Sequence, residues 1–455
     1  MTDTRTSPPP EADPSTPEAT GPGAELSASS SRAPGPASRS LWRHRDFVLL
    51  WSSQTISEMG TRISAISVPL LAASTLHATT FQVSLITALT WLPYLFFALP
   101  AGVIVDRVRK RRLMIWCDLV RFGLMASVPV AAFGWELTLA HVYVAVSLCG
   151  VLTVFFNVAY RTQLPLLVSQ EQLVEGNGKL ETSESVAELI GPAGGGLLVG
   201  LLGAVRTIMA DALSFVLSAL MLCLIRGDRS VDGEVDEDER VPFRAALRDG
   251  LGFVLGHPLL RRLLATSSTS NFFVMGMTGI EILYLVDELE ASPFVVGLVF
   301  TVGTIGGLVT GLLAPRLTER IGTARVIWVA MAAPGPLYLL IPLATPGWGV
   351  VLYAIGLTAF SANTVLYNAA EASYRQRITP PELMGRANAS VLWVCFGVIP
   401  LGAVFGGALA TWAGLRVALL VCVLGMWSAS LFVVFSPLRR MRDFAEEPGE
   451  LVAAG

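Results

Sequence analysis

Long apolar runs constrain this chain more than any other feature of its sequence. Between residues 47 and 436, stretches of roughly twenty mostly apolar residues recur, each long enough to cross about 30 Å of hydrocarbon as a helix. The chain is 53% hydrophobic and only 15% charged, whereas an average soluble domain carries about 25% charged residues. The sequence therefore predicts an all-α integral membrane protein.

We expect twelve transmembrane helices. Their predicted ranges are 47–71, 81–104, 113–134, 139–160, 180–202, 205–226, 260–286, 293–315, 324–344, 348–371, 386–412 and 414–436. One long polar interior segment divides six spans from six. The predicted organisation is a disordered cytoplasmic tail (1–40), a six-helix bundle (41–226), a cytoplasmic linker (227–258), a second six-helix bundle (259–438) and a cytoplasmic C-terminal tail (439–455).

Basic residues gather in alternate loops. If the N-terminus lies inside, the cytoplasmic loops hold most arginines, while the outer loops hold little beyond Arg206 and Arg416. Positive charge in short loops marks the cytoplasmic side, so we expect a multi-pass protein of the inner (cytoplasmic) membrane with both termini cytoplasmic. The chain has only two lysines, Lys110 and Lys179, and this arginine bias favours a bacterial source.

Several function classes find no support in the sequence. The cysteines lie in apolar segments, and no CxxC motif or histidine cluster is present, so neither a metal site nor a cofactor is expected. The chain has no phosphate-binding P-loop, and its net charge of -3 gives no reason to expect nucleic acid. We expect a protein that is not an enzyme and that does not use ATP itself.

A polar loop between the second and third spans contains the pattern Gly102-x-x-x-Asp106-Arg107-x-x-x-Arg111-Arg112. A degraded copy, Gly311, Arg316 and Arg320, follows at a constant spacing from Gly102, Arg107 and Arg111. Later pairs repeat in the same way, for example Gly203 and Gly414. The chain is therefore expected to consist of two related, pseudo-symmetric six-helix bundles with a cavity between them near the membrane midplane.

The loop pattern resembles the signature of the major facilitator superfamily. In that family the glycine lets two helices approach, and the Asp and Arg side chains hold the two halves of a transporter together. The resemblance implies a cytoplasmic gate, to which we assign Gly102, Asp106, Arg107, Arg111, Arg112, Asp118, Arg121, Arg316, Arg320, Glu371 and Arg375. Asp118 and Arg121 are expected to join the network of Asp106 and Arg107.

A second motif points to export. Gly191, Pro192, Gly195 and Gly196 resemble the antiporter motif of the superfamily, although Ala187 stands where that motif has an upstream glycine. The alternative interpretation is a close-packed helix crossing. The run from residue 162 to 177 resembles the linker of the enterobactin-exporter and macrolide-efflux branch, and the whole resemblance covers residues 42–436.

Charged residues inside the spans require a partner or a purpose, because a charge at the bilayer centre costs about 2.5–3.5 kcal/mol. Glu58 and Arg62 are spaced to pair on one helical face, either as a proton-carrying site or as a structural ion pair. Glu188 is expected to pair with an arginine such as Arg62, Arg121 or Arg161. Glu181 and Glu184 are expected near the cytoplasmic surface. Proton-coupling and cavity roles are assigned to Glu58, Arg62, Glu188, Asn157, Tyr160, Asn271, Glu281, Asn363 and Tyr367.

The asparagines and tyrosines of this set have an alternative role as interhelical contacts, each contributing about 0.6 kcal/mol. Aromatic residues such as Trp91, Tyr94 and Phe396 would suit an apolar ligand. The predicted function is a secondary active transporter, a monomer that exports an amphipathic drug, siderophore or other secondary metabolite in exchange for protons. A nutrient importer of the same fold and a transport-inactive membrane receptor are the alternatives. Membrane lipid surrounds the protein in each case.

Overall fold

The computed structural model describes residues 41–443 except 135, 170–171 and 227–242. Every regular element in these ranges is a helix. The expected N-terminal tail, the first half of the linker and most of the C-terminal tail lie outside the described residues.

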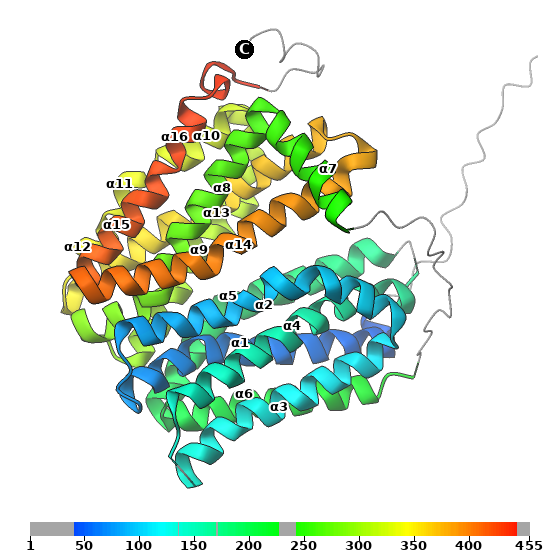
Figure 1. Ribbon diagram of the computed structural model, residues 1–455, viewed down its shortest axis with the longest axis vertical. Coiled ribbons are helices and arrows are strands. Elements are labelled where there is room, and N and C mark those ends of the chain that lie inside the picture. Colours follow the sequence, from blue (N-terminus) through cyan, green and yellow to red (C-terminus); the bar gives the residue numbers. More distant parts are fainter. Residues whose placement is uncertain (1–40, 135, 170–171, 227–242, 444–455) are drawn as a thin grey trace, which may run out of the picture. The chain divides into compact units, whose positions relative to one another are not determined.

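The first half of the chain forms six long helices (Figure 1). They are α1 (Arg45–Ser74), α2 (Thr80–Arg107), α3 (Lys110–Gly134), α4 (Leu139–Leu167), α5 (Leu173–Leu202) and α6 (Ala204–Cys223), preceded by the 3-10 turn η1 (Leu41–Arg43). Within this half, α1 packs on α5 and α6, and α4 packs on α2 and α3.

The second half begins with α7 (Phe243–Gly256), which packs on α14 and α8 from within the expected linker. The remaining elements are α8 (Pro258–Leu283), the π-helix η4 (Tyr284–Glu288), α9 (Pro293–Ile321), α10 (Arg325–Ala332), α11 (Gly335–Tyr338), α12 (Leu340–Leu343), η5 (Gly347–Gly349), α13 (Val350–Ile378), α14 (Pro381–Ala413), α15 (Leu415–Ser428), α16 (Ser430–Val434) and η6 (Pro437–Arg440).

The long helices follow the order of the expected spans, while α7 lies outside them. Eleven helical segments of the described chain are long and apolar enough to cross a membrane. The helix missing from that set is α1, which is 30 residues long but carries many serines together with Glu58 and Arg62. Some of its polar side chains bond to other helices, as Ser53 does to Ser218 at 2.7 Å. We count α1 as the twelfth span.

Proline and glycine explain where the helices break. The ninth span is divided into α10, α11 and α12, because Pro334, Pro336 and Pro342 each lack the backbone N–H that a continuous helix requires. Gly203 and Gly414 join α5 to α6 and α14 to α15 with φ of 81° and 89°. Residues with side chains rarely adopt this conformation, which explains why glycine recurs at both positions of the internal repeat.

Among the described residues, the two halves share a small buried cluster at one end of the helices. There, Ile66, Leu70 and Val199 of the first half pack with Ile282 of the second half. At the opposite end, where α1 begins and α4 ends, the buried clusters around Leu50 and around Leu263 each draw on one half alone. We call the first end the closed end and the second the open end.

Candidate functional site

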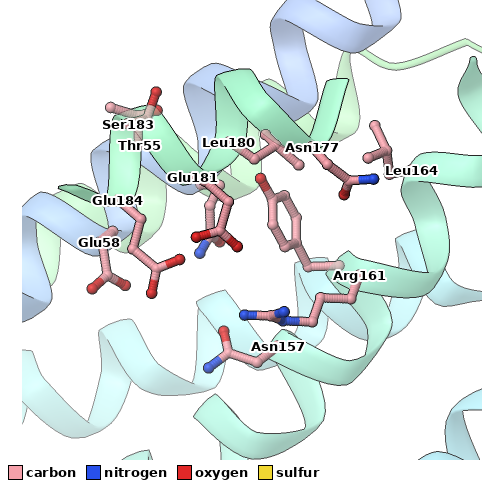
Figure 2. Close-up of a pocket in the computed structure, with 12 residues that line it drawn as sticks. Thr55, Glu58, Asn157, Arg161, Leu164, Asn177, Leu180, Glu181, Ser183 and Glu184 are labelled. Carbon is pink, nitrogen blue, oxygen red and sulfur yellow. The ribbon is translucent and has the colours of Figure 1, made fainter. Parts of the chain in front are cut away.

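A pocket lies among α1, α4 and α5, towards the open end (Figure 2). Its empty volume is about 660 Å³, part of which is open solvent. Polar side chains dominate its wall. The lining residues are Gln54, Thr55, Glu58, Asn157, Tyr160, Arg161, Leu164, Asn177, Leu180, Glu181, Ser183 and Glu184.

Charge in this pocket is mostly negative. The carboxylates of Glu58, Glu181 and Glu184 extend into the same space as the Arg161 guanidinium (Figure 2). The expected pair forms, since Arg62 Nε donates to Glu58 Oε1 at 2.8 Å. The proton-coupling role assigned to Glu58 stays a prediction.

Two polar atoms of the pocket wall are buried without a hydrogen-bond partner among the described residues. They are the Tyr160 hydroxyl and Gln54 Oε1. Tyr160 is only 6% exposed, and its hydroxyl interacts electrostatically with Glu184, Arg161 and Glu181. Buried polar atoms of native proteins are nearly always satisfied, so an unpaired acceptor at a pocket wall is a feature that a ligand or water can complete.

An aromatic cluster adjoins the pocket. Asn157 Nδ2 donates to the Tyr94 hydroxyl at 3.3 Å, which ties the pocket wall to α2. Tyr94 stacks on Phe396 of α14 with ring centroids 5.8 Å apart, and Trp91 stacks on the same ring at 6.1 Å. These three rings join the two halves of the chain beside the acidic pocket.

Asp118 and Arg121 lie elsewhere than expected. We predicted them at the cytoplasmic gate, but they form an ion pair inside the first half, where they are 0% and 2% exposed. Ser218 donates to Asp118 Oδ2 at 2.5 Å. The Arg121 guanidinium lies between the rings of Phe156 and Phe215, 4.5 and 4.4 Å from their centroids. The face of α3 that carries this pair turns towards α6 and α4, away from the loop.

A third buried charge lies nearby. Asp211 of α6 is 1% exposed and accepts hydrogen bonds from Ser64 and Ser214. Gly60 of α1 makes room for it, because a Cβ at that position would collide with Ser214 Oγ and the Asp211 carboxylate.

In the second half, Glu281 is the one charged residue that is buried among the described residues. Glu281 is 7% exposed, and its Oε2 accepts a hydrogen bond of 3.2 Å from Tyr353. Arg375 and Glu371 form the expected pair at 2.7 Å, although the gate role of that pair stays a prediction.

Two polar residues of the second half that were expected to line a cavity instead contact other residues of the same half. Tyr367 hydrogen bonds to Ser267 at 3.1 Å and to the Leu263 carbonyl at 3.3 Å, and Asn363 is buried beside Met331. Neither residue lines the pocket, nor does Asn271, which is half-buried on α8.

The loop between α2 and α3 shows two departures from expectation. A Cβ added at Gly102 would meet nothing within 4 Å, so this glycine marks no close helix approach here. Arg111 donates to the carbonyls of Leu222 and Cys223 at 2.8 and 2.6 Å and thereby caps the C-terminus of α6 in its own half.

The other arginines of the gate set are exposed, namely Arg107, Arg112, Arg316 and Arg320. Asp106 belongs to α2, but its side chain lies outside the described set.

The glycines of the α5 motif lie at close helix crossings. A Cβ at Gly191 would approach Arg62 Cβ to 2.6 Å, and one at Gly195 would lie 3.1 Å from Ile63 Cα, both on α1. On the other side of α5, a Cβ at Gly196 would collide with the Pro293 carbonyl of α9. The motif therefore forms a tight contact between the halves at the closed end, which matches the close-packed alternative interpretation.

Sequence reasoning missed part of the pocket. Gln54 lies one turn before Glu58, and this spacing was the available signal for its place on the same face of α1. Glu181 and Glu184 were expected at the surface; they are exposed, but they line the pocket. Glu188 is exposed and does not line the pocket. Two of the arginines expected to pair with it, Arg62 and Arg121, pair with Glu58 and Asp118 instead.

Comparisons with known proteins agree with this architecture. The sequence profile of the transmembrane secretion effector family matches residues 37–453. The multidrug efflux pump Tap of Mycolicibacterium fortuitum is 27% identical over 384 residues, which cover 82% of this chain and 91% of the pump. Macrolide efflux protein A of Streptococcus pyogenes is 22% identical over 390 residues, covering 83% of this chain and 94% of that protein.

A solved structure shows the same fold. The crystal structure of a bacterial homologue of the iron transporter ferroportin, in its inward-facing state, superposes with a TM-score of 0.68. Sequence identity is 17%, and the match covers 87% of this chain and 99% of that one. The chain therefore has the twelve-helix major facilitator fold expected from its sequence.

Proposed function

Because the chain belongs to the transmembrane secretion effector family, we propose that it exports amphipathic small molecules in exchange for protons. The family and the fold make it a multi-pass membrane transporter and not an enzyme. The substrate class and proton coupling are the proposed part. Relatives named as multidrug and macrolide efflux proteins support the direction of transport.

The observation that carries the proposal is the asymmetry between the two ends. The halves share a buried core at the closed end, whereas the acidic pocket lies towards the open end, where their cores are separate. A substrate entering from the open end would meet the pocket and then be passed on when the halves rock about it. This geometry is that of one state of an alternating-access cycle.

Basic residues support the orientation. The open end carries five basic residues from Arg107 to Arg112, where α2 ends and α3 begins. It also carries Arg375 and Arg377 at the end of α13. Positive loops face the cytoplasm, so the pocket would open inwards, both termini would be cytoplasmic, and the membrane would be the bacterial inner membrane. Both halves belong to one polypeptide, which supports a monomeric transporter.

Glu58 is the proposed proton carrier. It lines the pocket, pairs with Arg62 and interacts electrostatically with Glu184. A proton arriving on Glu58 would remove one negative charge from the pocket and release Arg62. A bound substrate and a bound proton would therefore compete for the same pocket, as exchange requires.

Everted membrane vesicles with an acidified lumen test the proposal. Cells expressing the protein provide the vesicles, and the probes are a radiolabelled macrolide and the fluorescent cation ethidium. Uptake that depends on the gradient and on the protein is the expected result. Probe accumulation with the opposite gradient would instead favour a nutrient importer, and no movement of any probe would favour a transport-inactive receptor.

Glu58→Gln separates coupling from structure. If Glu58 carries the proton, the variant should lose gradient-driven uptake and keep downhill exchange, because the amide mimics only the protonated state. If the pair is structural, Arg62 would be left without a counter-ion, and the melting temperature would fall instead. Unchanged gradient-driven uptake would remove Glu58 from the mechanism.

A further inference from the structure

We propose that the acidic pocket binds the ammonium group of a singly charged organic cation whose apolar body lies on Trp91, Tyr94 and Phe396. This inference rests on the proposed export function and names the substrate class of that site. Three features of the pocket support the inference. They are an excess of negative charge, unpaired polar atoms in its wall and an adjoining aromatic surface.

The charge balance of the pocket favours one positive charge. Glu58, Glu181 and Glu184 contribute three carboxylates, and Arg161 with the partner of Glu58, Arg62, contributes two guanidinium groups. One negative charge therefore remains uncompensated in a partly enclosed space. An anionic ligand would meet this charge as a repulsion, whereas a monovalent cation would neutralise it.

Unpaired polar atoms point to a ligand that donates hydrogen bonds. The buried Tyr160 hydroxyl and Gln54 Oε1 have no partner among the described residues, and both residues line the pocket. Carboxylate and amide oxygens accept but do not donate. Gln54 Oε1 needs a donor, and the Tyr160 hydroxyl can accept as well as donate. A protonated amine supplies both the positive charge and the N–H donors for these atoms.

The carboxylates do not make a metal site. Among the described residues, no group of three His, Cys, Asp or Glu side chains is close enough to hold one ion. An ammonium group on a larger molecule can lie between carboxylates that are further apart, because each N–H can address a different acceptor.

The aromatic cluster explains where the rest of the ligand lies. Asn157 connects the pocket to Tyr94, and Tyr94 and Trp91 both stack on Phe396 of the other half. Flat apolar groups pack well against such rings, and a cation beside them gains further attraction from their π faces. The ligand would therefore contact both halves of the transporter.

A matched pair of fluorescent probes tests the inference. The cationic probe is 1-pyrenemethylammonium, and the neutral probe of nearly the same shape is 1-pyrenemethanol. Binding to the purified full-length protein in lipid nanodiscs is read as energy transfer from tryptophan to pyrene, with empty nanodiscs subtracted. We expect the cation to bind at least about tenfold more tightly than the neutral probe, which corresponds to 1.4 kcal/mol.

Variants of the pocket residues test whether the preference for the cation arises in the pocket. Glu181→Gln combined with Glu184→Gln should weaken cation binding by at least about tenfold and leave 1-pyrenemethanol binding unchanged. Tyr160→Phe should weaken binding of the cation more than that of the alcohol. The control is Glu175→Gln, which makes the same charge change on α5 at a residue that pairs with Lys179 and does not line the pocket. Melting temperatures verify that every variant is folded.

Equal affinities for the two probes, or undiminished cation binding by the folded double variant, would overturn the inference. Either result would leave export intact if vesicle uptake of the macrolide persisted. Conversely, charge-selective binding without uptake of any probe would support the site while the export function failed. The two proposals therefore fail separately.

Discussion

A single methyl group at the closed end should shift the equilibrium between the state in which that end is closed and the state in which it is open. In Gly196→Ala, the new Cβ would lie 3.1 Å from Gly297 Cα and closer still to the Pro293 carbonyl. The Pro293 carbonyl oxygen would lie only 2.2 Å from the new Cβ. Ordinary van der Waals contacts need about 3.5 Å, so α5 and α9 would have to separate by about 1 Å. Both neighbouring atoms belong to backbone, which cannot rotate away as a side chain can.

The change in the ratio of the two conformational states can be calculated from the strain at the α5–α9 contact. Overpacking of this kind costs about 1–3 kcal/mol. Only the state with the closed end closed carries that cost, since the opposite state parts α5 from α9 there. The ratio of the two states should therefore change about 5- to 150-fold towards opening of the closed end. Gly194→Ala is the matched control, because its Cβ would meet nothing within 4 Å on the same helix.

Electron paramagnetic resonance measures this shift directly. Spin labels at Leu201 and Glu288, both exposed near the closed end, are introduced after the five native cysteines are replaced by alanine. The longer-distance population should grow in Gly196→Ala and stay unchanged in Gly194→Ala. Identical distance distributions in both variants would refute the assignment of this crossing as a contact that opens and closes.

Two further predictions concern stability. Arg121→Met should lower the free energy of unfolding by about 3–5 kcal/mol, because Asp118 would remain buried without its counter-ion. Adding Asp118→Asn should recover part of the loss, and equal melting temperatures of the single and double variants would contradict this account. Arg111→Ala should cost about 1 kcal/mol by uncapping α6, while Arg112→Ala, at an exposed neighbour, should cost nothing measurable in chemical denaturation.

The fold could be predicted from this sequence because each membrane-spanning helix needs about twenty mostly apolar residues, and such runs recur along the chain. Eleven spans are long and apolar enough to be recognised by that pattern alone. Pro334, Pro336 and Pro342 divide one of them into three short helices that still follow one another along the span. The resemblance carried by the loop of Gly102 led to the correct fold, although that glycine touches no neighbouring helix in this state.

Side-chain geometry was harder to predict, because sequence spacing fixes a helical face but not the direction in which that face points. Glu58 and Arg62 pair as their i, i+4 spacing suggested. Asp118 and Arg121 were equally well spaced, yet their face turns into the bundle and not to the gate. Partners such as Ser218 come from helices distant in sequence, so no local pattern could reveal them.

The buried pair on α3 also bears on how the protein is made. Membrane insertion proceeds from the N-terminus, and Ser218 follows Asp118 by 100 residues. At a synthesis rate of about 5–20 residues per second, α3 leaves the ribosome about 5–20 s before its partner on α6 exists. Because Arg121 is spaced to neutralise Asp118 within the same helix, the part of α3 that follows Arg112 can enter the bilayer with no net charge. The Asp118–Arg121 pair would therefore assist membrane insertion of α3 before it contributes to packing in the folded transporter.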